Sequence, residues 1–456
     1  MTYEETILKI INKNPERSKN DFLNINQLIR DNNLAYKGNY VRTLAIPKVI
    51  SAEQYRIIET FIEQMFLLFD KVIELYFRDP NYRSLFAFPP QLEALILASR
   101  RRHSWVPMAR IDFFLEQKSG DIMMCEINTD GTSAMYEDNT LGKLLTANSA
   151  FQDFVAGREY RLFELFDSWV TAFIEDYSSE ADDVSTTAKN AQRVSPRVAI
   201  VDFLDVGYLV EFEHFQAAFL RQGIECEICD IRELTFADGV LRTKSGMVID
   251  AIYRRAVTSD IMRHEKELAP FLQAVTSRAV HLIGDFVTQI VHNKRFFYII
   301  HHPLTQTILS ESEREFITCH FPATYPLTEV NLRTHLFTDM LAHDNYEEHK
   351  NWIIKPCDSY GAKGFFAGKN FTKEKWYEVC REHLNADYIL QRFHRPYLTA
   401  NIDFAAQNPV VANYSNLTGV FCYNGKARGM YSRMADGDII STQYDEKTVA
   451  TVVVGF

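Results

Sequence analysis

Apolar positions recur every three to four residues through most of residues 1–100, a spacing that predicts amphipathic helices. The longest such run, residues 55–77, follows the sequence SAEQ at residues 51–54, which is a capping box for a helix start. Charged residues interrupt the run, namely Glu59, Glu63, Asp70, Lys71 and Glu74. We therefore expect a long helix that faces a protein core and does not span a membrane.

Near residue 106 the pattern changes to alternation. Residues 108–128, MARIDFFLEQKSGDIMMCEIN, contain two alternating runs joined by a short polar turn, which predicts an antiparallel hairpin. Successive side chains of a strand point to opposite faces, so Arg110 and Asp112 share one face, as do Glu126 and Asn128. In simple register Asp112 lies beside Glu126 and Asn128, and such oxygen ligands suit Mg²⁺ held against phosphates. A solvated hairpin face with one salt bridge is the alternative interpretation.

A helical pattern at residues 139–177 leads into a small polar segment, residues 177–197, that predicts a linker or surface loop. The next sixty or so residues alternate a buried strand, a helix, a second strand and a hairpin, an order that predicts a small Rossmann-like lobe. Arg254 and Arg255 end its last strand, where open α/β sheets contact ligands. A pair of exposed arginines is the alternative.

Two lysines in the last third of the chain lie at positions where a lysine can bind phosphate. Lys294 begins an apparent helix, and Lys355 ends a buried strand before the loop DSYGAKG, residues 358–364. A lysine beside a glycine-containing loop can neutralise phosphate while the loop N–H groups cover it. No GxxxxGK[ST] motif is present, so this is a phosphate-covering hairpin and not a P-loop. A buried strand, YILQRF, and a hairpin with Asn-Gly at its tip follow, with Arg433 on the returning strand.

Composition narrows the class of protein. A chain of 456 residues with 46% hydrophobic residues should fold into two or three lobes. A net charge of −11 argues against a nucleic-acid partner, and the RRRH cluster at residues 100–103 is typical of a solvated face. The early residues hold no cleavable apolar run, so we expect a cytoplasmic protein with seven reduced cysteines. Cys226 and Cys229 lie on opposite faces of a predicted strand, and no second CxxC pair exists, so neither a zinc site nor a redox role is expected there.

Six short motifs occur in a specific order: RID at residues 110–112, EINT at 126–129, HNK at 292–294, IIKP at 353–356, YILQ at 388–391 and YSR at 431–433. The combination resembles the ATP-grasp superfamily, in the circularly permuted branch of glutathionylspermidine synthase and eukaryotic glutathione synthetase. The resemblance implies an α/β (α+β) ATP-grasp fold with a small Rossmann-like substrate lobe and a helical N-terminal region. It divides the chain into residues 1–105 (helical region), 106–180 (first part of the ATP-grasp core), 198–285 (substrate lobe) and 286–456 (nucleotide-binding part).

The same resemblance implies roles for particular residues. Catalysis falls to Arg110, which holds the acyl substrate, and to Arg433. The Mg²⁺ ligands are Asp112, Glu126 and Asn128. The residues implied in ATP binding are Lys294, Lys355, Gly361, Lys363, Gly364, Leu390, Gln391 and Arg392. Those implied in contacts with a peptide-like substrate are Thr132, Ser133, Arg254 and Arg255. Relatives commonly carry a metal-binding glutamate in the glycine loop, where this chain offers Asp358 and Ser359 instead.

The implied activity is ATP- and Mg²⁺-dependent amide ligation through an acylphosphate. Its partners are a small-molecule or peptide carboxylate and an amine acceptor, with no nucleic acid or membrane, and relatives include both monomers and homodimers. No nucleophilic cysteine precedes Cys125, so the hydrolytic amidase domain of bacterial glutathionylspermidine synthase is not expected. Two alternatives stay open: another ATP-grasp phosphoryl-transfer enzyme, and a non-catalytic binding protein with an ATP-grasp fold.

Overall fold

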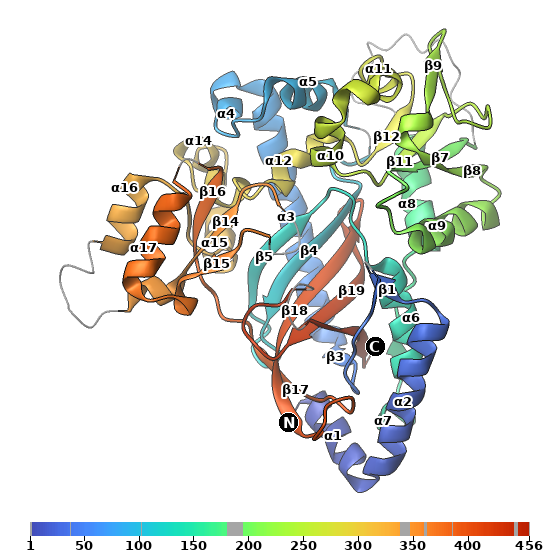
Figure 1. The fold of residues 1–456 in the computed structure, drawn as a ribbon, viewed down its shortest axis with the longest axis vertical. Coiled ribbons are helices and arrows are strands. Elements are labelled where there is room, and N and C mark those ends of the chain that lie inside the picture. Colours follow the sequence, from blue (N-terminus) through green and yellow to red (C-terminus); the bar gives the residue numbers. More distant parts are fainter. Residues whose placement is uncertain are drawn as a thin grey trace.

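A twisted eight-stranded sheet forms the centre of the molecule (Figure 1). The computed structural model describes residues 2–36, 38–101, 103–179, 195–337, 347–359, 363–384, 386–441 and 446–455. The main path of the sheet runs β3-β20-β19-β18-β4-β5, while β17 pairs with β18 and β6 pairs with β20. The strand bounds are β3 (Lys48–Ser51), β4 (Met108–Leu115), β5 (Ile122–Asn128), β6 (Tyr160–Arg161), β17 (Leu398–Ile402), β18 (Val411–Tyr423), β19 (Lys426–Ala435) and β20 (Lys447–Val454).

The predicted hairpin is confirmed as β4 and β5. In its register Asp112 faces Glu126 and Arg110 faces Asn128, with an irregularity directly after Asp112. The second predicted hairpin is confirmed as β18 and β19, with Asn424 and Gly425 at the tip in left-handed backbone conformations. Across β18, Asp112 of β4 lies opposite Gly419, which pairs with Tyr431 of β19, two residues before Arg433.

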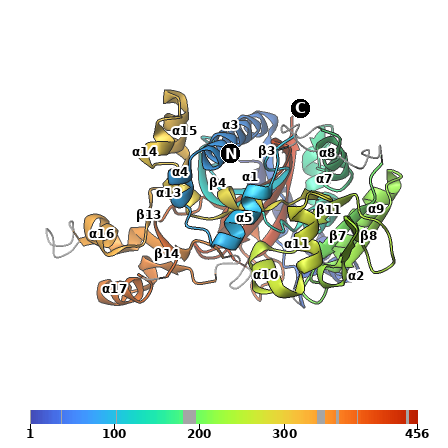
Figure 2. The ribbon, with the colours of Figure 1, turned by 90° about the horizontal axis from the view of Figure 1, so that it is seen from above.

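Helix α3 (Ala52–Arg78) covers one face of the central sheet (Figure 2). Ser51 accepts a hydrogen bond from the Gln54 amide and the Gln54 side chain accepts one from Ser51 N, so the predicted capping box is confirmed. Apolar side chains of α3 share one core cluster with β4 and β18, including Phe61, Phe113 and Val420. Among the described helices, none is long and apolar enough to cross a membrane.

Helices dominate the first hundred residues, as expected, but three strands were missed there. The helices are α1 (Tyr3–Lys13), α2 (Pro15–Asp31), α3, α4 (Pro80–Ser84) and α5 (Pro90–Ala98), and the extra strands are β1 (Ala35–Tyr36), β2 (Asn39–Tyr40) and β3. The helical prediction for residues 139–177 was too coarse, because the chain breaks into α6 (Met135–Thr146), α7 (Ser149–Val155), β6 and α8 (Asp167–Ser178). Asn148 stops the first helix by capping the second, since its side chain accepts from the amides of Ala150 and Phe151.

A four-stranded parallel sheet in the order β12-β11-β7-β8 confirms the Rossmann-like unit. Its elements are β7 (Val198–Asp202), α9 (Leu209–Arg221), β8 (Cys226–Asp230), β9 (Thr235–Ala237), β10 (Val240–Arg242), β11 (Ala251–Arg254), α10 (Thr258–Arg263), α11 (Ala269–Thr276) and β12 (His281–Ile283). Most of the predicted linker, residues 180–194, lies outside the described residues.

A third, antiparallel sheet in the order β13-β16-β14-β15 lies on the other side of the central sheet from the Rossmann-like unit (Figure 1). It is formed by β13 (Thr324–Pro326), β14 (Trp352–Pro356), β15 (Phe366–Ala367) and β16 (Tyr388–Arg392). The helices of this part are α12 (Gln289–His292), α13 (Phe296–Ile299), α14 (Pro303–Gln306), α15 (Glu311–His320), α16 (Glu329–Leu332) and α17 (Lys373–Glu382). The order strand, loop, strand after Lys355 is confirmed. The domain boundaries given above stay predictions.

Candidate active site

Two arginines converge on one buried carboxylate at the middle of the central sheet. Asp112 is fully buried; its Oδ1 accepts from Arg110 Nε at 2.8 Å and its Oδ2 from Arg433 Nη2 at 2.7 Å. Arg110 adds a second bond, from Nη2 to Asp112 Oδ2 at 3.0 Å, which makes the pair bidentate. Arg433 also lies 3.5 Å from Glu446. The β-sheet register brings these side chains together from β4, β19 and the start of β20.

Glu126 and Asn128 lie next to this cluster on β5. Asn128 Nδ2 donates to Asp112 Oδ2 at 3.1 Å, and Glu126 Oε1 lies 3.0 Å from Lys294 Nζ. Burial by itself would raise the pKa of Glu126, but Lys294 and Lys355 lower it to about 2, so the carboxylate is charged at neutral pH. The predicted placement of Asp112 beside Glu126 and Asn128 is confirmed. The alternative, a solvated hairpin face with one salt bridge, is wrong, because Asp112 is fully buried.

Two lysines extend to this cluster: Lys294 from the turn before α13, and Lys355 from β14 of the third sheet. Lys294 Nζ donates to the Ser359 carbonyl at 2.7 Å, and Lys355 Nζ donates to the Cys125 carbonyl of β5 at 3.4 Å. Burial, together with the nearby Lys294, lowers the pKa of Lys355. Both lysines are buried, and both contact β5 at the junction between the central sheet and the third sheet. An anion that entered this junction would meet both.

The residues present fit a magnesium ion that keeps phosphate and water ligands. The Glu126 side chain is 26% exposed, and the Asn128 amide donates through its nitrogen, which leaves its oxygen for a cation. Asp112 already accepts hydrogen bonds from Arg110, Arg433 and Asn128, so it could ligate a cation only after losing one of these bonds. Within the described ranges, no group of three or more His, Cys, Asp or Glu side chains forms a complete cage. Magnesium sites completed by one or two carboxylates and substrate phosphates are common.

The predicted phosphate loop is only partly described. Gly361 lies outside the described residues, while Asp358 and Lys363 are exposed. Gly364 has a φ of +70°, and a Cβ there would lie 2.6 Å from the Tyr388 hydroxyl, so the close approach of loop and β16 requires glycine. Whether this loop covers phosphates stays a prediction.

The residues predicted to contact adenine lie on β16. Leu390 and Gln391 belong to a central strand that pairs with β13 on one side and β14 on the other, so their backbone groups face sheet neighbours. Gln391 donates through its side chain to Thr324 at 2.8 Å, and Arg392 pairs with Glu348. Contact of Leu390, Gln391 and Arg392 with adenine stays a prediction.

The predicted substrate residues Thr132 and Ser133 lie in the segment between β5 and α6. Ser133 O accepts from Arg110 Nη1 at 2.9 Å, and Thr132 Oγ1 donates to Asn128 O at 3.0 Å. Arg254 and Arg255 are buried and not exposed, and their guanidinium groups bond to protein groups, as described below. A direct substrate contact by these two arginines is untested.

Sequence reasoning missed a tyrosine and a glutamate beside the arginines. The Tyr431 ring lies 5.5 Å from the Arg110 guanidinium carbon and 5.7 Å from that of Arg433, and its hydroxyl donates to Glu137 at 3.0 Å. Burial, opposed by this hydrogen bond, raises the pKa of Glu137 to about 7. The signal available in the sequence was Tyr431 itself, two residues before Arg433 and thus on the same face of β19.

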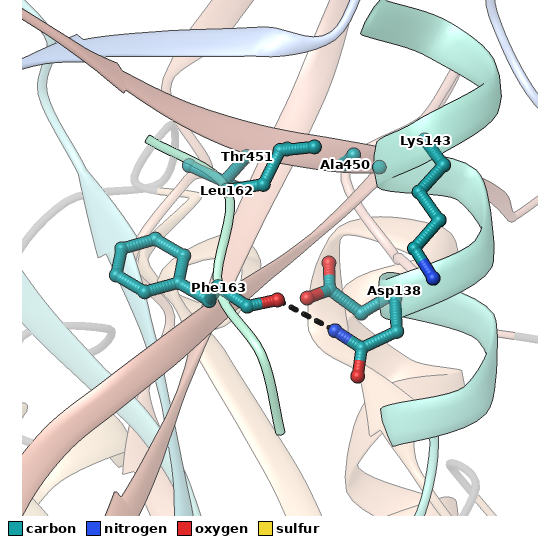
Figure 3. A pocket seen from close by; sticks show the side chains of 8 residues that line it. Asp138, Lys143, Leu162, Phe163, Ala450 and Thr451 are labelled. Atoms are coloured by element: carbon teal, nitrogen blue, oxygen red, sulfur yellow. Dashed lines mark hydrogen bonds between the residues drawn. The ribbon is translucent and has the colours of Figure 1, made fainter. Parts of the chain in front are cut away.

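A small pocket of about 30 Å³ lies beside Asp138, the residue that follows Glu137 in α6 (Figure 3). Asp138 of α6 lines it together with Phe163 and with Ala450 and Thr451 of β20, and Asn139 donates to the Phe163 carbonyl at 2.6 Å. Burial raises the pKa of Asp138 well above its usual range, and Asp138 Oδ1 has no hydrogen-bond partner among the described residues. The volume holds about one water molecule, so this pocket is structural.

Comparison with solved structures identifies the fold. A glutathione synthetase-like effector from Globodera pallida, in its apo form, matches with a TM-score of 0.59 at 11% identity, over 95% of this chain and 96% of that one. A protein provisionally assigned as a gamma-glutamylcysteine synthetase from Methylobacillus flagellatus matches with a TM-score of 0.39 at 10% identity, over 89% of each chain. An ATP-grasp ligase solved with Mg and ADP gives a TM-score of 0.25 at 10% identity, over 58% of this chain and 90% of that one.

The chain thus has the α/β fold of the ATP-grasp superfamily, as the sequence motifs indicated. The match to the glutathione synthetase-like effector extends over nearly the whole length of both chains. Neither a family model nor a curated protein sequence matches the chain. Identity this low establishes the fold alone.

Proposed function

We propose that this protein is an ATP- and Mg²⁺-dependent carboxylate–amine ligase of the glutathionylspermidine synthase-like kind. One observation carries the proposal: four cations converge from separate segments. Arg110, Arg433 and Lys294 pair with the carboxylates of Asp112 and Glu126, and Lys355 donates to the carbonyl of Cys125, the residue before Glu126. Four cations exceed the charge of these two carboxylates, and of Glu446 beside them, so the cluster favours a further anion. A nucleoside triphosphate and a substrate carboxylate both carry the required negative charge.

The proposed reaction proceeds in two displacements. A substrate carboxylate oxygen attacks the γ-phosphorus of ATP, the bond to the ADP oxygen breaks, and an acylphosphate forms. An amine then attacks the acyl carbon, phosphate leaves and the amine loses a proton. Lys294 and Lys355 would neutralise the phosphates, and Arg110 would bind the carboxylate and the oxyanion that follows. Magnesium held by Glu126 and Asn128 would neutralise phosphate oxygens during transfer.

Nucleotide binding is the first test. Calorimetry with Mg²⁺ and a non-hydrolysable ATP analogue should give binding to the wild type and none to the double variant Glu126→Ala/Lys355→Ala. The matched control is Lys375→Ala/Glu378→Ala, which removes an exposed ion pair of the same residue types from α17. The control should bind as the wild type does.

The second test follows ADP release and product mass with peptide and amino-acid carboxylates against amino-acid and polyamine acceptors. An amide product supports the ligase. A stable phosphorylated product would instead identify another phosphoryl transferase, and failure of the wild type to bind nucleotide would identify a non-catalytic protein with this fold.

A further inference from the structure

Two buried ion pairs lie where the segment after β5 meets the Rossmann-like unit: the first joins the segment to the unit, and the second lies within the unit. Arg254 Nη1 lies 2.9 Å from Asp130 Oδ1, and Arg255 Nη2 lies 2.7 Å from Glu211 Oε1. All four side chains are at most 5% exposed. Buried charges require partners, so each arginine is tied to its carboxylate. Thr258 adds to the first pair, since its amide donates to Asp130 Oδ2 at 2.7 Å.

Glu211 has a second role at the start of α6. Its Oε2 accepts from the amides of Met135 at 2.8 Å and Tyr136 at 3.2 Å, the first two residues of that helix. The residue before the helix, Ala134, offers no side-chain cap and has a φ of +85°. Glu211 comes from α9, so a different element supplies the cap and the negative charge that the first turn of a helix favours.

Two arginines hold consecutive carbonyl groups of the same segment. Arg255 Nη1 donates to the Thr132 carbonyl, and Arg110 Nη1 donates to the Ser133 carbonyl at 2.9 Å. Gly131, with a φ of +62°, lets the chain pass close to Arg255, because a Cβ there would lie 2.7 Å from the Arg255 carbonyl oxygen. The backbone of residues 131–134 is thus fixed from the Rossmann-like unit on one side and from the arginine cluster on the other.

We infer that Glu211 is a positioning residue for the active site. Through Arg255 and the start of α6 it sets the backbone of residues 131–134, and that backbone orients the Arg110 guanidinium for an incoming carboxylate. Arg254 and Arg255 then act through this segment and need not touch substrate. The inference rests on the proposed function only for the task of Arg110, because the Glu211 contacts are formed in the protein without substrate.

Hydrogen–deuterium exchange of the full chain, without substrate, tests the contacts directly. Glu211→Gln should raise the exchange rate of amides at residues 131–136 at least tenfold. Because that variant leaves Arg255 buried and unpaired, the double variant Glu211→Gln/Arg255→Met is made as well; it buries no lone charge and should show the same local increase. The matched control is Asp250→Asn, which breaks the Arg197–Asp250 pair of the same unit, at 2.8 Å, and should leave residues 131–136 unchanged.

A kinetic and binding comparison separates positioning from general destabilisation. Once a substrate pair is identified, Glu211→Gln should raise KM for the carboxylate at least tenfold, while the calorimetric Kd for Mg²⁺ with the ATP analogue stays within twofold. Exchange at residues 131–136 that is unchanged in the folded double variant would overturn the inference. So would a nucleotide Kd that weakens as much as KM. If the wild type forms no amide, the proposed function fails and the exchange result still decides the role of Glu211.

Discussion

Gly419 lies opposite Asp112 in the pairing of β18 with β4. A Cβ at this position would lie 2.7 Å from Asp112 Oδ1 and 3.0 Å from Arg110 Cδ. Because Gly419 has no side chain, the Arg110–Asp112 ion pair has room to lie across this face of the sheet. This requirement for glycine is a matter of space, because the backbone conformation of Gly419 is not the left-handed one.

We expect Gly419→Ala to lower the free energy of unfolding by about 1–3 kcal/mol, the usual cost of overpacking a filled site. It should also weaken carboxylate binding, because Arg110 must move. Chemical denaturation measures the first effect and titration with the substrate carboxylate the second. Gly437→Ala is the control, since nothing lies within 4 Å of its added carbon. Equal stability of the two variants would contradict the steric argument.

Glu137 gives the stability of the protein a specific pH dependence. Its pKa is raised from 4.5 to about 7 in the folded protein, chiefly by burial. Between these values the folded protein keeps a proton that the unfolded chain releases, so the contribution of Glu137 to stability is complete below pH 4.5 and is lost as pH rises through 7. Unfolding measured from pH 4.5 to 8 should show a smaller decline for Glu137→Gln than for the wild type. The exposed Glu213→Gln should leave the decline as it is, and an identical profile for Glu137→Gln would refute the assignment.

At the scale of elements, α3 depends on its N-cap residue, Ser51. Ser51 is the last residue of β3 and also caps α3, so one side chain marks the change from strand to helix. We expect Ser51→Ala to reduce the free energy of unfolding by about 0.5–2 kcal/mol through the lost cap, with nucleotide binding unchanged. Ser84→Ala, which removes an exposed hydroxyl from α4, should cost less. The prediction fails if the two variants unfold at the same denaturant concentration.

Elements with a strong local period were predictable from the sequence, and elements defined by distant partners were not. The β4–β5 hairpin followed from alternation and a polar turn, and its register placed Asp112 beside Glu126. Strand β3 has only four residues and exists because β20 pairs with it, so no local pattern marks it. The same reason hid Gly419, whose role depends on Asp112, and Glu211, whose partners lie in the segment before α6 and after β11. Periodicity reports which face of an element is buried but not what lies against it.

At the scale of the molecule, the junction between the central sheet and the third sheet is held by charge. Lys294 contacts Glu126 of β5 and the Ser359 carbonyl after β14, and Lys355 reaches across to the Cys125 carbonyl. A ligand bound by both lysines should therefore stabilise both sheets together.

Hydrogen exchange with and without Mg²⁺ and an ATP analogue measures this coupling. We expect slower exchange in both β5 and β14, with little change in β7 and β8 of the parallel sheet, which the lysines do not touch. The Lys355→Met variant should lose the protection in both places. Protection confined to β14 would show that the ligand does not bridge the sheets.

The parallel pairing of β3 with β20 has a consequence for synthesis of the protein. Lys48 pairs with Thr451, about 400 residues later along the chain. At roughly 5–20 residues per second, a ribosome needs on the order of 20–80 s to make the partner of β3 after β3 itself. During that time the edge of β3 is unpaired, and the buried Lys48 side chain lacks its acceptors on Asn416 and Thr418. The central sheet can therefore close only after β20 has been synthesised, and chaperones that shield strand edges should associate with the nascent chain until then.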